Sequence, residues 1–109
     1  MKESVFQKQV IDYLKSENIW HVKYWAGSAF TKEGVPDILA CINGYFHGIE
    51  LKTDIGIESK LQAYNMDGII NSGGFAYVLR PTKLKGAKYQ EYKYKEYTFE
   101  QWKEIFFKK

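Results

Sequence analysis

The sequence contains little cysteine and histidine, and it has no long apolar run. Cys41 is the only cysteine, so the chain cannot form an internal disulfide. His21 and His47 are the only histidines, and with one cysteine they do not provide a set spaced for structural zinc. Any bound metal would therefore need oxygen ligands. Because no segment is apolar for long enough to cross a bilayer and the start lacks a secretory leader, we expect a cytoplasmic protein without a membrane partner.

The length and the charge distribution give the next constraints. A chain of 109 residues is long enough for one hydrophobic core, which predicts a single domain over residues 1–109. Residues 1–79 carry seven Lys and Arg against nine Asp and Glu, whereas residues 80–109 carry nine against four. The basic end is either a contact for a polyanion or a solvated lysine surface.

Hydrophobic periodicity predicts an α/β fold with the order α-β-β-β-α-β-α. Three- and four-residue spacings indicate amphipathic helices, and runs rich in β-branched and aromatic residues indicate strands. The predicted elements are helix 3–17, strand 19–25, strand 35–42, strand 45–52, helix 59–71, strand 75–79 and helix 98–108. The segment between the last strand and the last helix is a connection rich in lysine and tyrosine.

The dipeptide Asn43-Gly44 is a strong signal for a two-residue hairpin turn. With that turn, every opposed pair of residue numbers sums to the same value, and Asp37 lies directly opposite Glu50. Because side chains alternate between faces, Lys52 shares the face of these two acids. Both faces of the hairpin are otherwise largely apolar, so the hairpin is predicted to be central in the sheet.

Two carboxylates on directly opposed residues of a hairpin repel each other, and partial burial strengthens the repulsion. A divalent cation would offset it, because hard ions such as Mg²⁺ bind carboxylate oxygens, waters and phosphate. Lys52 would then lie where it could lower the pKa of a water or stabilise charge on a phosphate. The alternative is a buried ion cluster without chemistry.

These residues resemble a known nuclease signature. Pro36-Asp37 followed by Glu50-Leu51-Lys52 is similar to the PD-(D/E)XK pattern. In order and spacing, residues 3–79 resemble the virus-type replication-repair nuclease (VRR-NUC) domain, and they are similar also to archaeal Holliday junction resolvases. The segments that carry the resemblance are Glu3 with Gln7, Gly27-Ser28, "GVPDIL", "GYFHGIELK", "GIESKLQ" and "GGFAYV". The resemblance implies a restriction-endonuclease-like core with a small mixed sheet flanked by helices, Mg²⁺ or Mn²⁺ dependence, and phosphodiester hydrolysis.

By position, the resemblance also implies roles for single residues. Asp37 and Glu50 would be metal ligands together with the Leu51 carbonyl, and Lys52 would be the catalytic lysine. Glu3 would hold a water of the metal from the first helix.

Two further residues gain a role from the resemblance, and one of them has a second explanation. Ser28 would contact DNA from the Gly-Ser loop, and Gln62 would lie near Lys52 or the scissile phosphate. The spacing of Ser59 and Gln62 also fits a capping box, in which the glutamine only closes the start of a helix. Glu3 likewise suits the positive end of a helix dipole without any catalytic role.

The connection before the last helix interleaves lysines with tyrosines. Lys88, Lys93 and Lys95 could neutralise phosphates, and the tyrosine rings between them could stack on unpaired bases. A tyrosine-rich edge hairpin would have the same composition. We expect the lysines to contact DNA and the tyrosines to be structural.

The sequence thus predicts a metal-dependent DNA endonuclease, selective for branched DNA such as Holliday junctions. Two cuts in a symmetric junction require two sites, so we expect a homodimer. A flap-type or less selective endonuclease acting as a monomer is one alternative. A DNA-binding module that keeps the fold without the chemistry is another.

Overall fold

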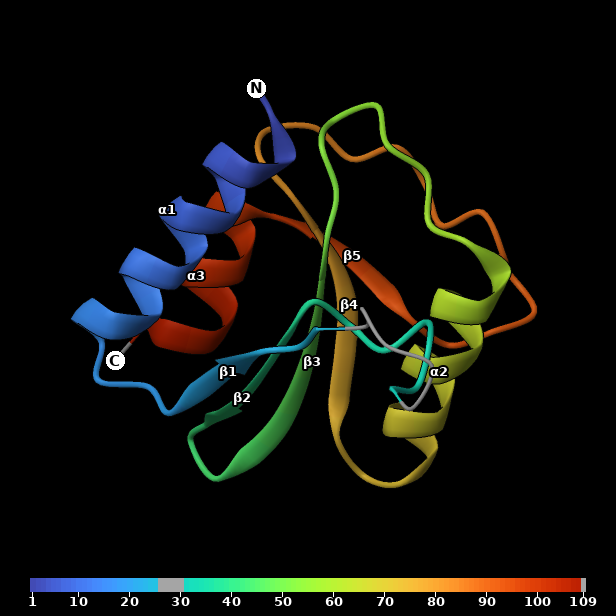
Figure 1. The fold of residues 1–109 in the computed structure, drawn as a ribbon, viewed down its shortest axis with the longest axis horizontal. Helices are drawn as coiled ribbons and strands as arrows, with labels where there is room; N and C mark the ends of the chain where they lie inside the picture. The colour runs from blue at the N-terminus through green and yellow to red at the C-terminus, as the bar shows by residue number, and fades with distance from the viewer. Residues whose placement is uncertain (26–30, 109) are drawn as a thin grey trace.

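The computed structural model describes residues 1–25 and 31–108, which form three helices and five strands (Figure 1). The helices are α1 (Glu3–Ser16), α2 (Lys60–Asn71) and α3 (Phe99–Phe107). The strands are β1 (His21–Lys23), β2 (Ile38–Ile42), β3 (Tyr45–Leu51), β4 (Phe75–Arg80) and β5 (Lys95–Thr98). The predicted α/β class and order are confirmed. The structure adds the short strand β5 within the connection that is rich in lysine and tyrosine.

The five strands form one mixed sheet in the order β1-β2-β3-β4-β5. β1, β2 and β3 are antiparallel neighbours, whereas β3, β4 and β5 run parallel. Asn43 and Gly44 both have positive φ, 53° and 84°, as a two-residue hairpin turn requires. The predicted register is confirmed, because Ile42 pairs with Tyr45 and Ile38 with Ile49. In the strand order, β3 is the central strand.

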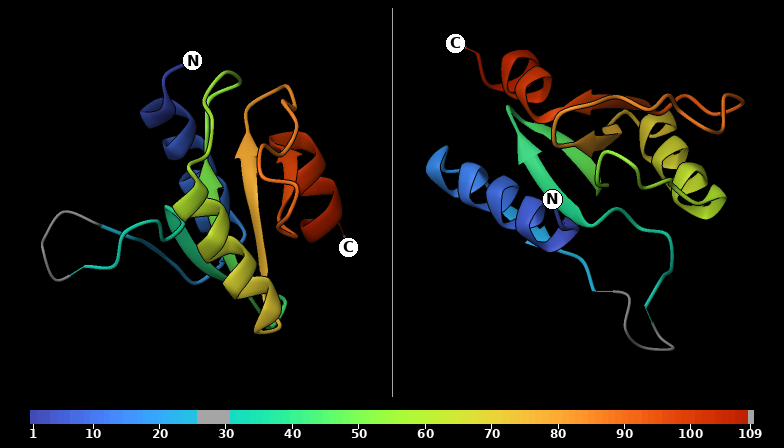
Figure 2. Two further views of the ribbon diagram at one scale, coloured as in Figure 1. Left: turned by 90° about the vertical axis from the view of Figure 1, so that its right-hand side faces the viewer. Right: turned by 90° about the horizontal axis from the view of Figure 1, so that it is seen from above.

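Helices cover both faces of the sheet. Figures 1 and 2 show α1 and α3 on one face and α2 on the other. The predicted stripe of α1 is buried at Phe6, Val10 and Leu14, against inward-facing residues of β2 and β3. α2 forms the crossover between the parallel strands β3 and β4 and packs a second core cluster. No helix in the described ranges is both long enough and apolar enough to span a membrane.

Candidate active site

The predicted site lies where β3 ends and α2 begins. In open α/β sheets, the carboxyl ends of the parallel strands are where ligands usually bind. Glu50 and Lys52 come from this end of β3, Asp37 directly precedes β2, and Gln62 lies in the first turn of α2. The structure therefore brings together four residues that are separated by up to 25 positions in the sequence.

Asp37 is held by two backbone hydrogen bonds. Its carbonyl oxygen accepts from the Tyr24 N–H at 2.8 Å, which ties it to the end of β1. Its carboxylate oxygen Oδ2 accepts from the Leu51 N–H, also at 2.8 Å. The carboxylate thus continues the hydrogen bonding of the hairpin beyond its last residue pair and is fixed beside the end of β3.

Glu50 is almost completely buried, with 1% of its surface exposed. Its Oε2 accepts a hydrogen bond from Gln62 Nε2 at 3.0 Å and lies 3.6 Å from Lys52 Nζ. Its Oε1 is buried and has no hydrogen-bond partner among the described residues. Such an atom is unusual, because buried polar atoms nearly always find a partner.

Burial and the neighbouring Asp37 carboxylate raise the pKa of Glu50 to about 9, although the Lys52 ammonium acts in the opposite direction. The structure thus places the two acidic side chains close together, as the register predicts, and this proximity disfavours the ionised form of Glu50. Glu3, in the exposed first turn of α1, adds a smaller upward contribution to the pKa of Glu50.

Gln62 forms the predicted capping box and also contacts the candidate site through Glu50. Its Oε1 accepts from the Ser59 N–H at 2.8 Å, while its own N–H donates to Ser59 Oγ at 3.1 Å, which completes the capping box. The Nε2 of the same side chain donates to Glu50. One amide therefore connects the start of α2 to the buried carboxyl group.

Asp37 and Glu50 fit a hard divalent cation better than a structural zinc ion. No group of three or more His, Cys, Asp and Glu side chains in the described ranges is placed to hold a metal. The predicted third ligand, however, is the Leu51 backbone carbonyl, and Mg²⁺ commonly uses one or two carboxylates and completes its shell with water. The buried Oε1 of Glu50, which lacks a partner in the described part of the chain, is the observation that favours such a ligand set.

The tail lysines are only partly free to contact DNA. The Lys93 ammonium donates to Asn71 Oδ1 at 2.9 Å, and its backbone N–H donates to Asp67 Oδ1 at the same distance. Lys88 and Lys95 are both exposed, and the Lys88 Nζ lies 5.3 Å from the centroid of the neighbouring tyrosine ring. Ser28, the other predicted DNA contact, lies outside the described residues.

The tail tyrosines are structural. Tyr94 is 4% exposed, and its hydroxyl donates to the carboxylate of Glu58. Tyr89 and Tyr92 pack against the cluster under α2, and Tyr97 packs against the larger core on the other face. These rings pack into the two cores and stabilise the connection.

The histidines are structural as well. His47 is buried, with its Nδ1 2.7 Å from the Tyr77 hydroxyl, and burial lowers its pKa to about 4. The Trp102 indole N–H donates to the same hydroxyl at 2.7 Å. His21 Nδ1 is 2.8 Å from the carbonyl of Ile19. Neither ring belongs to the candidate site.

Sequence reasoning missed the role of Arg80, the only arginine of the sequence. The side chain is fully buried at the end of β4, where its Nε donates to Glu96 at 2.7 Å. Its Nη1 donates to the carbonyls of Thr53 and Gly56 at 2.7 and 2.6 Å, and its Nη2 lies 3.6 Å from Glu58. Arg80 therefore fixes the segment that joins the carboxyl end of β3 to α2. An arginine that ends an apolar strand was the signal in the sequence.

Comparisons of the chain with models of protein families, with curated proteins and with solved structures gave no match. The resemblance to VRR-NUC domains therefore rests on the motif residues themselves. Any activity assigned to the site is an inference from its geometry and chemistry.

Proposed function

We propose that the protein is a metal-dependent nuclease that hydrolyses phosphodiester bonds in DNA. The observation that carries the proposal is the buried Glu50 carboxyl group, which has Asp37 and Lys52 as neighbours and a second oxygen without a hydrogen-bond partner in the described ranges. A site without a ligand would be more stable if this carboxyl group were replaced by an apolar side chain. Two acids beside a lysine can supply metal ligands and a cation for phosphoryl chemistry.

Each side chain has a task in this proposal. Asp37 and Glu50, with the Leu51 carbonyl, would hold Mg²⁺ or Mn²⁺. When bound, the cation would supply Lewis-acid charge for the attack of water on phosphorus. Lys52, whose side chain is 16% exposed, can reach a phosphate oxygen and stabilise the charge that develops there. Gln62 orients the Glu50 carboxyl group, and Glu3 can hold a water molecule at the edge of the site.

The form of the DNA and the assembly are part of the same proposal. We expect branched DNA, such as a four-way junction, to be the preferred substrate of a homodimer, because one chain offers one site and a symmetric junction needs two cuts. The basic end of the chain, with the exposed Lys95, would add contacts to phosphates. A cytoplasmic location remains a prediction from the sequence.

Cleavage assays test the proposal directly. Purified protein is incubated with Mg²⁺ or Mn²⁺ and end-labelled linear duplex, flap or four-way-junction DNA. Asp37→Asn should abolish both cleavage and Mg²⁺ binding measured by calorimetry, because it removes a ligand charge. Lys52→Met should abolish cleavage but leave Mg²⁺ binding largely intact, because the lysine acts on the phosphate.

An exposed ion pair on α1 provides matched controls. Lys8 and Asp12 bond to each other at 2.8 Å on the surface, so Asp12→Asn and Lys8→Met change the same residue types without touching the site. Both should cleave like the wild type. If neither metal supports cleavage of any of the three DNAs, the nuclease proposal is wrong, and DNA binding without cleavage would favour the non-catalytic module.

A further inference from the structure

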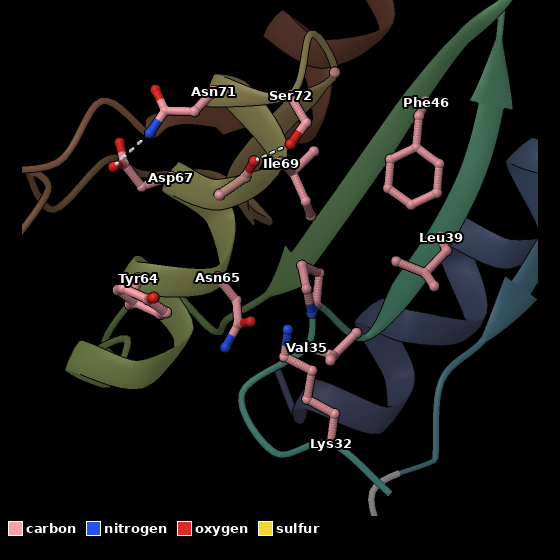
Figure 3. Close-up of a pocket in the computed structure, with 13 residues that line it drawn as sticks. Lys32, Val35, Leu39, Phe46, Tyr64, Asn65, Asp67, Ile69, Asn71 and Ser72 are labelled. Atoms are coloured by element: carbon pink, nitrogen blue, oxygen red, sulfur yellow. Dashed lines mark hydrogen bonds between the residues drawn. The ribbon is translucent and has the colours of Figure 1, made fainter.

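A groove of about 590 Å³ runs between α2 and the β2–β3 hairpin (Figure 3). One wall is formed by residues of α2 between Tyr64 and Ser72, and the other wall contains Leu39 and Phe46. Its volume is within the range of about 300–1,000 Å³ that is typical of small-molecule sites. The groove has no part in the candidate active site described above.

Gly68 indicates that the groove is kept open. This glycine lies inside α2, where glycine costs about 1 kcal/mol relative to alanine. Gly68 is exposed, and a Cβ atom there would meet no atom within 4 Å apart from its chain neighbours and the backbone of its own helix; the backbone φ is not positive. Gly48 differs, because a Cβ there would lie 2.6 Å from Ile69 Cδ1. Packing therefore explains Gly48 but not Gly68, whose missing side chain leaves space in the groove.

One end of the groove adjoins the candidate active site. Pro36 lines the groove and directly precedes Asp37, and Asn65 lines it one helical turn after Gln62. Asn65 Nδ2 donates to the carbonyls of Glu33 and Leu61, at 3.3 and 2.9 Å, and thereby holds the loop against α2 at this end. A strand whose phosphate lies at the site could therefore extend into the groove.

The side chains that line the groove suit nucleotides with exposed base faces. Phe46 on β3 and Tyr64 on α2 both line the groove and are 47% and 61% exposed, and the Tyr64 ring also contacts the Tyr92 ring edge to face. Lys32 lines the groove, and the Lys93 ammonium is held at its α2 edge by Asn71. Aromatic rings with nearby cations bind unpaired bases and their phosphates, whereas lysines are depleted in protein–protein interfaces.

The groove also contains one negative charge. Asp67 lines it, and its carboxylate accepts hydrogen bonds from Asn71 Nδ2 at 3.2 Å and from the Lys93 N–H at 2.9 Å. Two cations thus accompany one anion whose oxygens are already engaged, so the local charge still favours phosphates.

We propose that this groove binds unpaired nucleotides of a DNA strand, next to the phosphate that the active site cleaves; the inference rests on the proposed nuclease function. Bases in a perfect duplex cannot use the groove, because their faces are covered by stacking. Among branched substrates, those that also carry a single-stranded segment beside the cleavage site should therefore be cleaved faster than fully paired ones.

Binding without metal tests the groove separately from catalysis. A fluorescein-labelled oligothymidine and a blunt duplex of equal length are titrated with protein in EDTA, and anisotropy is measured. Gly68→Leu places a side chain in the groove and should weaken oligothymidine binding by about tenfold or more, as loss of one stacked base does. Because leucine is the better helix former, the variant should melt no lower than the wild type. Gly68→Ala, which leaves most of the space open, should bind nearly as the wild type does.

A second pair of variants does not depend on Gly68. Tyr64→Ala should weaken oligothymidine binding, whereas Tyr45→Ala should not, because Tyr45 is a similarly exposed tyrosine on the other face of the hairpin. In Mg²⁺, Gly68→Leu should still cleave blunt duplex but lose its preference for DNA with unpaired nucleotides.

Three results would overturn the groove proposal. The first is no binding of oligothymidine by the wild type, and the second is equal binding by Gly68→Leu and the wild type. The third is a wild-type dimer that Gly68→Leu converts to a monomer in sedimentation, because the groove would then be an interface between two copies. If the variants weaken binding as expected but no DNA is cleaved, the groove stands and the nuclease function fails.

Discussion

Replacement of Glu50 by glutamine should stabilise the metal-free protein. The Glu50 carboxyl group is buried beside Asp37, and the resulting rise of its pKa to about 9 means that the folded protein holds it neutral at pH 7. Glutamine reproduces the neutral form: one end of its amide can accept from Gln62 Nε2, and the other can donate to the Asp37 carboxylate. The variant therefore keeps the hydrogen bond from Gln62 and removes the ionisable group.

The size of the effect follows from proton linkage. Above the unfolded-state pKa of 4.5, the unfolded chain loses the proton of Glu50 while the folded protein keeps it until about pH 9. The folded wild type therefore loses stability as pH rises through this window, by about 1.4 kcal/mol per pH unit. At pH 7 the advantage of Glu50→Gln is on the order of 3 kcal/mol, which corresponds to roughly 10–20 °C in Tm for a domain of this size.

Urea unfolding followed by circular dichroism, in EDTA at several values between pH 5 and 9, measures the difference. The advantage of Glu50→Gln should grow with pH and level off above about pH 9. Glu104→Gln, at an exposed glutamate of α3, is the matched control and should differ from the wild type by a small amount that does not grow with pH. Added Mg²⁺ should stabilise the wild type and not Glu50→Gln, because the ion binds the folded protein through the ionised carboxylate.

A different outcome would refute the reasoning. If Glu50→Gln were no more stable than the wild type at pH 8 in EDTA, burial and the Asp37 charge would not destabilise the ionised carboxyl group. The central argument for a cation at this site would then be lost.

Three further predictions concern single residues. Gln62→Glu and Gln101→Glu both keep a group that can close a capping box, so both variants should melt close to the wild type. Only Gln62→Glu loses the donor to the buried Glu50 carboxyl group, and it should slow cleavage about tenfold or more. Arg80→Met leaves buried carboxylates unpaired and should cost about 3–5 kcal/mol in urea unfolding; a loss under about 1 kcal/mol would contradict the role of Arg80 in fixing the segment after β3. Burial lowers the pKa of His47 from 6.5 to about 4, so the unfolded chain takes up the proton before the folded protein does. The free energy of unfolding should therefore fall as pH drops from 6.5 to about 4, and His47→Asn should remove that part of the pH dependence.

The features that follow from local rules were predictable from the sequence. Asn43-Gly44 determined the hairpin turn, and the two-residue period of a strand then determined that Asp37, Glu50 and Lys52 meet at one end of one face. The stripe of α1 and the capping box of α2 likewise depend on spacings of three and four residues. These relations involve neighbours in the sequence or across one tight turn, so no tertiary information is needed.

Only the tertiary structure decided which of several local options each polar group takes. The amide of Gln62 could have served the cap alone, but the packing of α2 on the sheet brings it to Glu50, twelve residues away. The tyrosines of the tail could have been exposed, but Tyr94 and its neighbours fill the core under α2. The contacts of Arg80 and the open space beside Gly68 likewise depend on how segments far apart in the sequence are placed. Burial and close packing depend on the whole folded chain, and no spacing along the sequence encodes them.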